Sequence, residues 1–228
     1  MIRWLHISDL HFNNDDMSTD SMREELPKYL KKNNIRCDYV FCTGDIRTAN
    51  AESNHFPDEA ARFLIDLCIA VGTSTDRLFI VPGNHDVDRD ATGRDEVIRK
   101  ICFQRNGYYD PKYGKIEEDD LKVVYSGQEE FREFLSKIYT ADRMAKYANP
   151  LNPHFNVETE NFNILHIDST LTYTKDQESV DLVIGTKLLQ NALEELNPDK
   201  PTVLLSHYPF TSLLQEEKKY VRELLYRK

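Results

Sequence analysis

Residues 78–86 read LFIVPGNHD, an apolar run followed by a proline-glycine turn and three polar residues. The run Leu78–Val81 predicts a short buried strand, which Pro82 and Gly83 close. In an open α/β sheet, ligands bind beyond the carboxyl ends of the strands. This stretch therefore predicts a strand with a candidate ligand site at its end.

The rest of the chain repeats this pattern of strand and helix. Upstream, Ile2–Ser8 and Tyr39–Cys42 predict two further buried strands, and residues 22–33 and 58–70 predict helices. Alternation of this kind implies βαβ units and a parallel sheet. Downstream we predict strands at Phe155–Glu158, Phe162–Asp168 and Thr202–Ser206, and helices at Gly185–Leu196 and Glu216–Tyr226. The prediction is a mixed α/β sandwich flanked by helices.

Residues 88–152 break this rhythm. They are rich in charge and tyrosine, and they contain one clear helix signal, near residues 128–147. We interpret the region as an insertion over the sheet edge that would act as a cap, with ordinary packing as the equally weighted alternative. We treat residues 1–228 as a single domain.

The composition narrows the class of protein. The chain has 228 residues, 40% of them hydrophobic, and a net charge of −10, which disfavours a broad basic surface for nucleic acid. A nuclease whose metals supply the local positive charge is not excluded. No apolar run approaches membrane-spanning length, and we expect no membrane partner. The cysteines form no C-x-x-C pair, so we expect a reducing, cytoplasmic location; they are Cys37, Cys42, Cys68 and Cys102.

Polar side chains of metal-binding type follow four of the predicted strands. They are Asp9 and His11, then Asp45 after Gly44, then Asn84, His85 and Asp86, and finally His207. In an extended segment, residues i and i+2 point the same way, so Asp9 and His11 would reach one ion. Each motif alone is weak, but their joint occurrence at strand ends predicts a two-metal site.

The mixed set of carboxylate, imidazole and amide ligands suits divalent ions such as manganese, iron, zinc or nickel. Two such ions roughly 3.5–4 Å apart would clamp a phosphoryl group and activate a bridging water as nucleophile. We expect two divalent ions, with manganese the first choice.

These motifs resemble those of the calcineurin-like metallophosphoesterases, which run D-x-H, G-D, G-N-H-D/E, H and G-H-x-H, and the resemblance extends from Asp9 to His207. It implies a metallophosphoesterase-type β-sandwich. It also implies that the first ion is held by Asp9 and His11 and the second by Asn84 and His207, with Asp45 bridging both.

The same resemblance gives roles to the two residues that follow Asn84. His85 would steady the transition-state phosphate or protonate the leaving group. Asp86 would orient His85, as carboxylates near metal sites do.

The sequence departs from the family pattern at its end. It contains no G-H-x-H, and each histidine of that motif would complete one metal site. We therefore expect the 228 residues to be the N-terminal part of a longer domain, truncated at the C-terminus.

The resemblance implies hydrolysis of a phosphodiester or phosphomonoester by a metal-bridging hydroxide. Nucleotides and nucleic acids are among the substrates that suit this chemistry. An alternative interpretation is an effector module at the head of a large multidomain NTPase, inactive in isolation and linked to downstream domains. A third is a degenerate, non-catalytic interaction module, against which the intact ligand positions weigh.

Other polar residues are first given structural interpretations. We predict His6 to be a core residue of the first strand, Trp4 to anchor that strand, and Arg47 to be a surface residue rather than a phosphate contact. Asp88 and Arg89 either line the site or form a surface pair. We interpret His55, His154 and His166 as structural, because they lack a partner motif. Tyr108 and Tyr109 would either stack on a base or ring or, as is usual for tyrosines in an insertion, pack.

Overall fold

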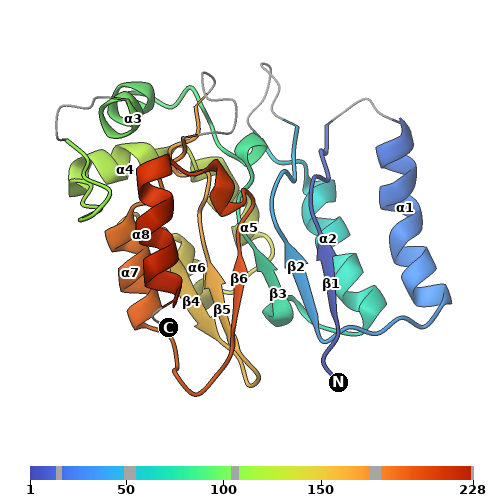
Figure 1. Ribbon diagram of the computed structural model, residues 1–228. Helices are drawn as coiled ribbons and strands as arrows, with labels where there is room; N and C mark the ends of the chain where they lie inside the picture. The colour runs from blue at the N-terminus through green and yellow to red at the C-terminus, as the bar shows by residue number, and fades with distance from the viewer. Residues whose placement is uncertain (14–16, 49–54, 104–107, 175–180, 227–228) are drawn as a thin grey trace.

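The computed structural model describes residues 1–13, 17–48, 55–103, 108–174 and 181–226. Within these ranges the chain forms two three-stranded sheets with helices on their outer faces (Figure 1). This is the mixed α/β architecture that the alternation of strands and helices predicts.

The first sheet consists of three parallel strands in the order β1-β2-β3. They are β1 (Trp4–Ile7), β2 (Tyr39–Cys42) and β3 (Leu78–Ile80), so the predicted parallel sheet is confirmed. The connecting helices α1 (Met17–Lys32) and α2 (Asp58–Val71) pack on one face of this sheet. A short 3-10 helix, η1 (Thr75–Arg77), leads into β3.

The second sheet has the order β4-β5-β6. As predicted, β4 (Phe155–Glu158) and β5 (Asn163–His166) pair antiparallel, and β6 (Thr202–Leu205) runs parallel to β5. Helices α7 (Thr186–Glu194) and α8 (Gln215–Tyr226) cover its outer face. The 3-10 helix η3 (Phe210–Ser212) lies between β6 and α8.

An aromatic-rich layer joins the two sheets into a sandwich. It combines Tyr39, Phe41, Phe79 and Val81 of the first half with Phe162, Ile164 and Leu205 of the second. Burial of large aromatic rings dominates the energetics of such a core. The sandwich brings the carboxyl ends of β1, β2, β3 and β6 to the same end of the molecule (Figure 1).

The first strand is more exposed than its apolar sequence predicts. The Trp4 side chain is 56% exposed, and His6 is also exposed. Leu5 and Ile7 pack toward the helices, but β1 is an edge strand whose inter-sheet face is only partly covered. The prediction of a core position for His6 is therefore wrong, because an apolar run cannot show which strand lies at the edge.

Residues 88–152 contribute four helices in their described part, where the sequence indicates one. They are α3 (Arg94–Cys102), α4 (Glu118–Ser126), α5 (Glu129–Ser136) and α6 (Ala141–Tyr147). The predicted single helix divides into α5 and α6, since the backbone of Thr140 is extended. Both pack into the core beneath the first sheet, whereas α3 and α4 belong to a separate cluster with Leu171 and Val183. A cap over a substrate remains a prediction.

All four cysteines lie within the described residues and are free thiols. Among the helices of the described ranges, none is both long and apolar enough to cross a membrane.

Candidate metal centre

The loops that follow β1 and β2 run side by side and are joined by backbone hydrogen bonds. Asp9 N–H donates to the Gly44 carbonyl at 3.0 Å, and His11 N–H donates to the Asp45 carbonyl at 3.0 Å. The sheet pairing thus continues into both motifs. As a result, the first two motifs are held next to each other by the backbone and not only by their side chains.

Three of the candidate ligands have a left-handed backbone. The φ angle is 56° at Asp9, 46° at His11 and 53° at Asp45. The extended geometry assumed for the D-x-H segment is therefore wrong. The two side chains still meet, since His11 Nε2 lies 3.8 Å from Asp9 Oδ1. Strained backbone of this kind clusters at functional sites.

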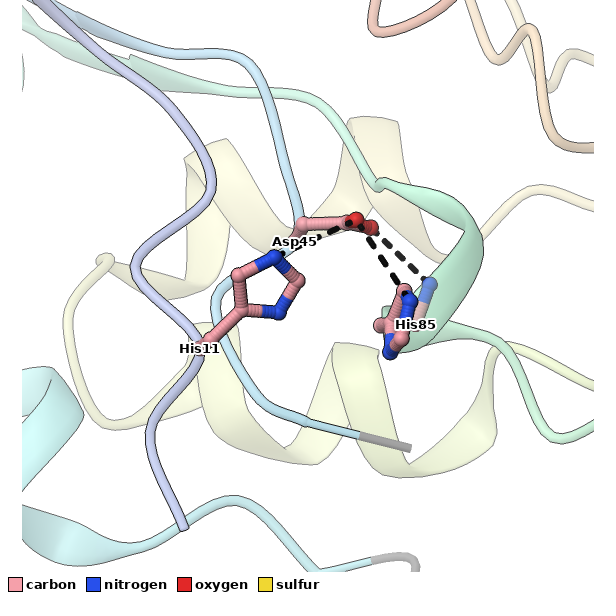
Figure 2. Close-up of side chains that lie close together, drawn as sticks. All are labelled: His11, Asp45 and His85. Atoms are coloured by element: carbon pink, nitrogen blue, oxygen red, sulfur yellow. Dashed lines mark hydrogen bonds and ion pairs between the residues drawn. The ribbon is translucent and has the colours of Figure 1, made fainter. Parts of the chain in front are cut away.

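The Asp45 carboxylate lies between two groups of potential ligands. Its Oδ2 is 4.0 Å from His11 Nε2 and 3.9 Å from His85 Nε2, as Figure 2 shows. Its Oδ1 is 3.6 Å from His207 Nε2 and accepts a hydrogen bond from His85 N–H at 2.9 Å. The side chain is almost fully buried, so each oxygen faces protein groups rather than bulk water.

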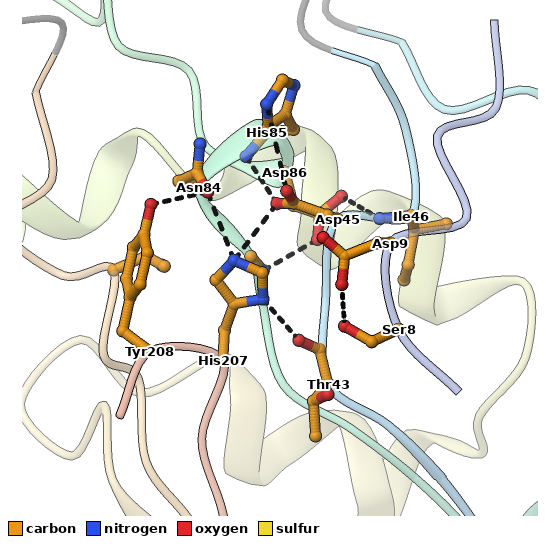
Figure 3. A network of polar contacts seen from close by, with 12 residues as sticks. Ser8, Asp9, Thr43, Asp45, Ile46, Asn84, His85, Asp86, His207 and Tyr208 are labelled. Carbon is orange, nitrogen blue, oxygen red and sulfur yellow. Dashed lines mark hydrogen bonds and ion pairs between the residues drawn. The ribbon is translucent and has the colours of Figure 1, made fainter. Parts of the chain in front are cut away.

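A second group of ligand atoms gathers around His207 (Figure 3). The His207 Nδ1–H donates to the Thr43 carbonyl at 2.7 Å, so Nε2 of the neutral ring carries a lone pair. This Nε2 lies 3.2 Å from Asn84 Oδ1. Tyr208 O–H donates to the same Asn84 oxygen at 2.7 Å.

These lone pairs point at one another, which tests whether the donor set fits a cation. Nε2 of His207, Oδ1 of Asn84 and Oδ1 of Asp45 all present electron density to a common region. Such an arrangement is repulsive unless a proton or cation lies between the atoms. Nitrogen and oxygen donors of this type bind divalent transition ions, so the residues present fit the metal that the sequence indicates.

One cluster of titratable groups within the described residues differs slightly from the expected first ligand pair. The nitrogen and oxygen atoms of His11, Asp45 and His85 lie within 4.8 Å of one another. Asp9 is more exposed, at 57%, and its Oδ2 accepts a hydrogen bond from Ser8 Oγ. His85 thus shares Asp45 Oδ2 with His11, and the two rings pack edge to face at 4.9 Å.

His85 is held in its neutral form. Burial, first of all, lowers its pKa, as do the charges of His11, Arg89 and His207, whereas Asp45 opposes the shift. A neutral imidazole still has one N–H to donate. His85 is therefore suited to donate a hydrogen bond to an anionic oxygen near neutral pH.

Asp86 clamps the loops together. Its Oδ1 accepts hydrogen bonds from Ile46 N–H at 2.9 Å and Arg47 N–H at 3.2 Å, and its Oδ2 accepts one from Gly83 N–H at 2.8 Å. The carboxylate is fully buried. These contacts join the loop after β2 to the 3-10 helix η2 (Asn84–Asp86). Orientation of the His85 ring by Asp86 stays a prediction from the resemblance.

The pKa of Asp86 reflects competing effects. Burial and the nearby Asp45 charge raise it to about 7, while hydrogen bonds from the Gly83 and Arg47 backbone oppose the shift. Two carboxylates this close favour a cation, because a positive charge stabilises both ionised forms.

Two glycines make this approach of loops possible. Gly44 has φ +89°, and a Cβ placed there would lie 2.1 Å from Gly83 N. A Cβ on Gly83 would lie 2.2 Å from the Asp45 backbone nitrogen. Both positions therefore exclude any side chain.

Two of the remaining histidines, His154 and His166, have buried structural surroundings, as predicted. His154 is buried and donates to the Ile184 carbonyl at 2.7 Å, and His166 is buried against Phe155 at 4.5 Å between rings. His55 lies 2.8 Å from Glu130 on the surface. None of these three contributes an atom to the cluster at Asp45.

Arg47 is not a surface residue. Its side chain is only 1% exposed, and its guanidinium lies over the Phe56 ring at 5.2 Å. Burial lowers the Arg47 pKa, against the charges of Asp86 and its neighbours. The surface interpretation is therefore wrong, since the loop turns the side chain into the core.

Two residues beside the candidate ligands were missed by sequence reasoning. Thr43 accepts the His207 Nδ1–H through its carbonyl, and Tyr208 contacts Asn84. A backbone carbonyl leaves no sequence signal, because any residue supplies it. Tyr208 directly follows His207 in the sequence, and this position next to a predicted ligand was the signal that could have indicated a residue of the site.

Comparison with known proteins places the chain in a family. Residues 2–228 match the model of the calcineurin-like phosphoesterases, and the chain belongs to that family. It is similar to an uncharacterized metallophosphoesterase-like protein of Bacillus subtilis (strain 168), YydB, with 27% identity over 201 residues. The match covers 87% of this chain and 40% of the relative, so the chain spans about 40% of that protein's length. The family and the fold class predicted from the motifs are confirmed.

Proposed function

We propose that this chain carries the site of a phosphoester hydrolase that uses two divalent ions. The observation that supports this most is the Asp45 carboxylate, whose two oxygens face two different sets of ligand atoms. One carboxylate shared in this way is the arrangement that a pair of adjacent cations requires. Family membership supplies the reaction class, which is metal-dependent hydrolysis of phosphate esters.

The residues divide into two ligand groups. Asp9 and His11 would hold one ion and Asn84 and His207 the other, with Asp45 common to both. The second group is the better ordered, because His207 is fixed through Thr43. Outer hydrogen bonds of this type orient a ligating ring and raise its basicity.

Bound divalent ions would neutralise charge on the phosphoryl oxygens and lower the pKa of a water molecule. The protein's own contribution is positioning. His85 lies beside Asp45, and its backbone N–H donates to that carboxylate, which fixes the main chain at this position. Its neutral N–H would donate to a phosphoryl oxygen or to the leaving-group oxygen.

The proposed substrate is a phosphodiester or phosphomonoester, and manganese is the proposed metal. The mixed nitrogen and oxygen donors support Mn²⁺ over Ca²⁺, which prefers oxygen alone.

Hydrolysis of bis(4-nitrophenyl) phosphate with Mn²⁺ tests the proposal. We expect Asp45→Asn to lower kcat/KM by roughly 10³-fold, since loss of the shared carboxylate removes both ions. The matched control is Asp66→Asn, the same change on the exposed face of α2, which should leave the rate unchanged. Full activity in Asp45→Asn would refute the proposal.

A second candidate function is that of a module within a longer protein. The observation in its favour is the length of the relative, of which this chain matches 40%. In this case the 228 residues would be silent and the parent protein active toward the same ester. Equal activity of the chain and its parent would argue against it.

A further inference from the structure

Arg89 is a cationic residue close in sequence to the candidate ligands, and the proposed mechanism gives it no role. It is half-buried and follows His85 by four residues. Its guanidinium lies over the ring of Tyr173, with the central carbon 5.5 Å from the ring centre. Across the part of the chain that the structure describes, Arg89 makes no ion pair. Asp88 is engaged otherwise, accepting a hydrogen bond from Asp90 N–H at 2.9 Å, so the surface pair considered from the sequence does not form.

Tyr173 links Arg89 to the candidate metal ligands. The Tyr173 ring stacks on Tyr208 with centres 5.9 Å apart and planes inclined by 29°. Tyr208 in turn donates its hydroxyl to Asn84 Oδ1 at 2.7 Å. The contact row Arg89, Tyr173, Tyr208 and Asn84 therefore flanks the site on one side.

This row rests on a fixed base. The buried guanidinium of Arg94 donates to the carbonyls of Leu171 at 2.9 Å and Tyr173 at 2.5 Å. Tyr208 N–H donates to Ser169 Oγ at 2.9 Å. A guanidinium stacked on a ring held in this way is ordered before any ligand arrives, which reduces the entropy lost on binding.

Arg89 differs from two other ring-stacked arginines. Arg47 is buried in the core, and so is withdrawn from any ligand. Arg77 stacks on Tyr39 at 5.3 Å but is paired with Glu160 at 2.8 Å, and it precedes β3 at the opposite end of the strand. Arg89 alone among these three combines partial exposure with a place beside His85.

We propose that Arg89 binds a second anionic group of the substrate, one linkage away from the phosphate that is hydrolysed. The inference rests on the proposed function and specifies its substrate class: phosphate esters that carry a neighbouring phosphate, for which nucleotides with two phosphate groups are convenient probes. A guanidinium presents paired N–H donors that match two phosphate oxygens. In a chain of net charge −10, such a cation also offsets the repulsion of a doubly charged ligand.

The arrangement selects phosphate rather than base. One face of the Tyr173 ring is occupied by Arg89 and the ring also stacks on Tyr208, while Tyr208 packs against His207 at 4.8 Å. The ring faces that make these contacts are occupied by protein groups and are not open to a nucleobase. The inference therefore includes weak discrimination between bases.

Calorimetric titration tests this directly with two nucleotides, thymidine 5′-monophosphate and thymidine 3′,5′-bisphosphate, each with the Mn²⁺-loaded protein. Wild type should bind the bisphosphate about 10-fold more tightly than the monophosphate, as expected for one added charge-assisted contact. In Arg89→Met the two affinities should become equal, and Arg89→Lys should keep part of the preference. The control is Arg77→Met, which removes another ring-stacked arginine and should keep the full preference.

The outcomes separate the two proposals. An unchanged preference in Arg89→Met, with a melting temperature like that of wild type, overturns the role of Arg89 and leaves the metal centre untouched. Equal binding of both nucleotides by wild type overturns it too. Failure of wild type to bind either nucleotide overturns the proposed function and the inference together.

Discussion

Asp86 and Glu217 are both buried carboxylates that accept backbone N–H groups from a neighbouring loop, yet only Asp86 lies at the candidate metal centre. Glu217 in α8 accepts from Ile184 N–H at 3.0 Å and from Gly185 N–H at 2.9 Å, and Tyr109 O–H also donates to it. It thereby fixes the N-terminus of α7 to residues of the 88–152 region. The two carboxylates therefore have the same structural role: each joins a loop to a neighbouring segment through hydrogen bonds.

Their electrostatic surroundings separate them. Burial raises the pKa of each to about 7. At Asp86 the next cause is Asp45, a like charge that raises the pKa further. At Glu217 the next cause is the Tyr109 hydroxyl, a donor that lowers it. Both carboxylates accept three hydrogen bonds, but only Asp86 lies near a second carboxylate, whose repulsion a bound cation would relieve.

The largest expected effect concerns the loop that Asp86 clamps. Gly44→Ala should cost about 4 kcal/mol or prevent folding, because the new Cβ would meet the backbone of Gly83 at 2.1 Å. Gly93→Ala is the matched control, with φ +77° but a nearest atom at 3.6 Å, and should cost only about 1 kcal/mol. Urea unfolding measures both. Equal costs would show that the loops are not in close contact.

The next effect compares the two carboxylates themselves. Asp86→Asn and Glu217→Gln should each cost about 2 kcal/mol of stability, because the new amide turns a donor toward backbone N–H groups. Only Asp86→Asn should also weaken Mn²⁺ binding, by roughly 10- to 100-fold. Manganese titration checks this. Equal metal affinities in the two variants would remove the distinction drawn between the sites.

The pH dependence of stability gives a third test. The Glu217 pKa is about 7 in the folded chain against an ordinary value of 4.5, so the folded state holds more protons between these values. Stability should therefore fall as pH rises through that window, by up to roughly 3 kcal/mol, and stay low above it. Glu217→Gln should remove this part of the slope. A wild-type slope retained in the variant would contradict the assignment.

The smallest effects are expected at the two tyrosine hydroxyls. Tyr109→Phe should cost about 1 kcal/mol above pH 7, since ionised Glu217 loses a donor. Tyr208→Phe should change stability less but alter Mn²⁺ affinity, because its hydroxyl contacts Asn84 Oδ1. A change of Mn²⁺ affinity in Tyr109→Phe, with only a loss of stability in Tyr208→Phe, would contradict the roles proposed for the two hydroxyls.

Much of the scaffold follows from the sequence. Tyr39–Cys42 and Phe155–Glu158 form strands at the predicted residues, and α2 begins at Asp58 as predicted. These segments have strong apolar runs or helical periodicity with clear boundaries. The meeting of the first three strand-end motifs was predictable, because parallel strands of one sheet share one carboxyl edge. His207 follows β6 of the second sheet, so its place beside Asn84 depends on how the two sheets pack.

Other features depend on contacts that the sequence does not encode locally. The left-handed backbone of Asp9 and His11 arises from pairing with the loop after β2. The exposure of Trp4 depends on its place at the sheet edge. The bond between Tyr109 and Glu217 joins residues 108 positions apart, and α3 and α4 are short helices rich in charged residues. Asp86 is the clearest example. The family resemblance predicts that it lies at the site, but it does not predict that its hydrogen-bond partners are the backbone N–H groups of Ile46, Arg47 and Gly83.

The most direct test of the account is the number of Mn²⁺ ions bound per chain, read by equilibrium dialysis together with electron paramagnetic resonance for coupling between ions. The account predicts about two coupled ions in wild type, and loss of the coupled pair in Asp45→Asn while Asp66→Asn keeps it. A coupled pair that survives in Asp45→Asn, or a wild type that binds no manganese, would contradict the claim that Asp45 joins two metal sites.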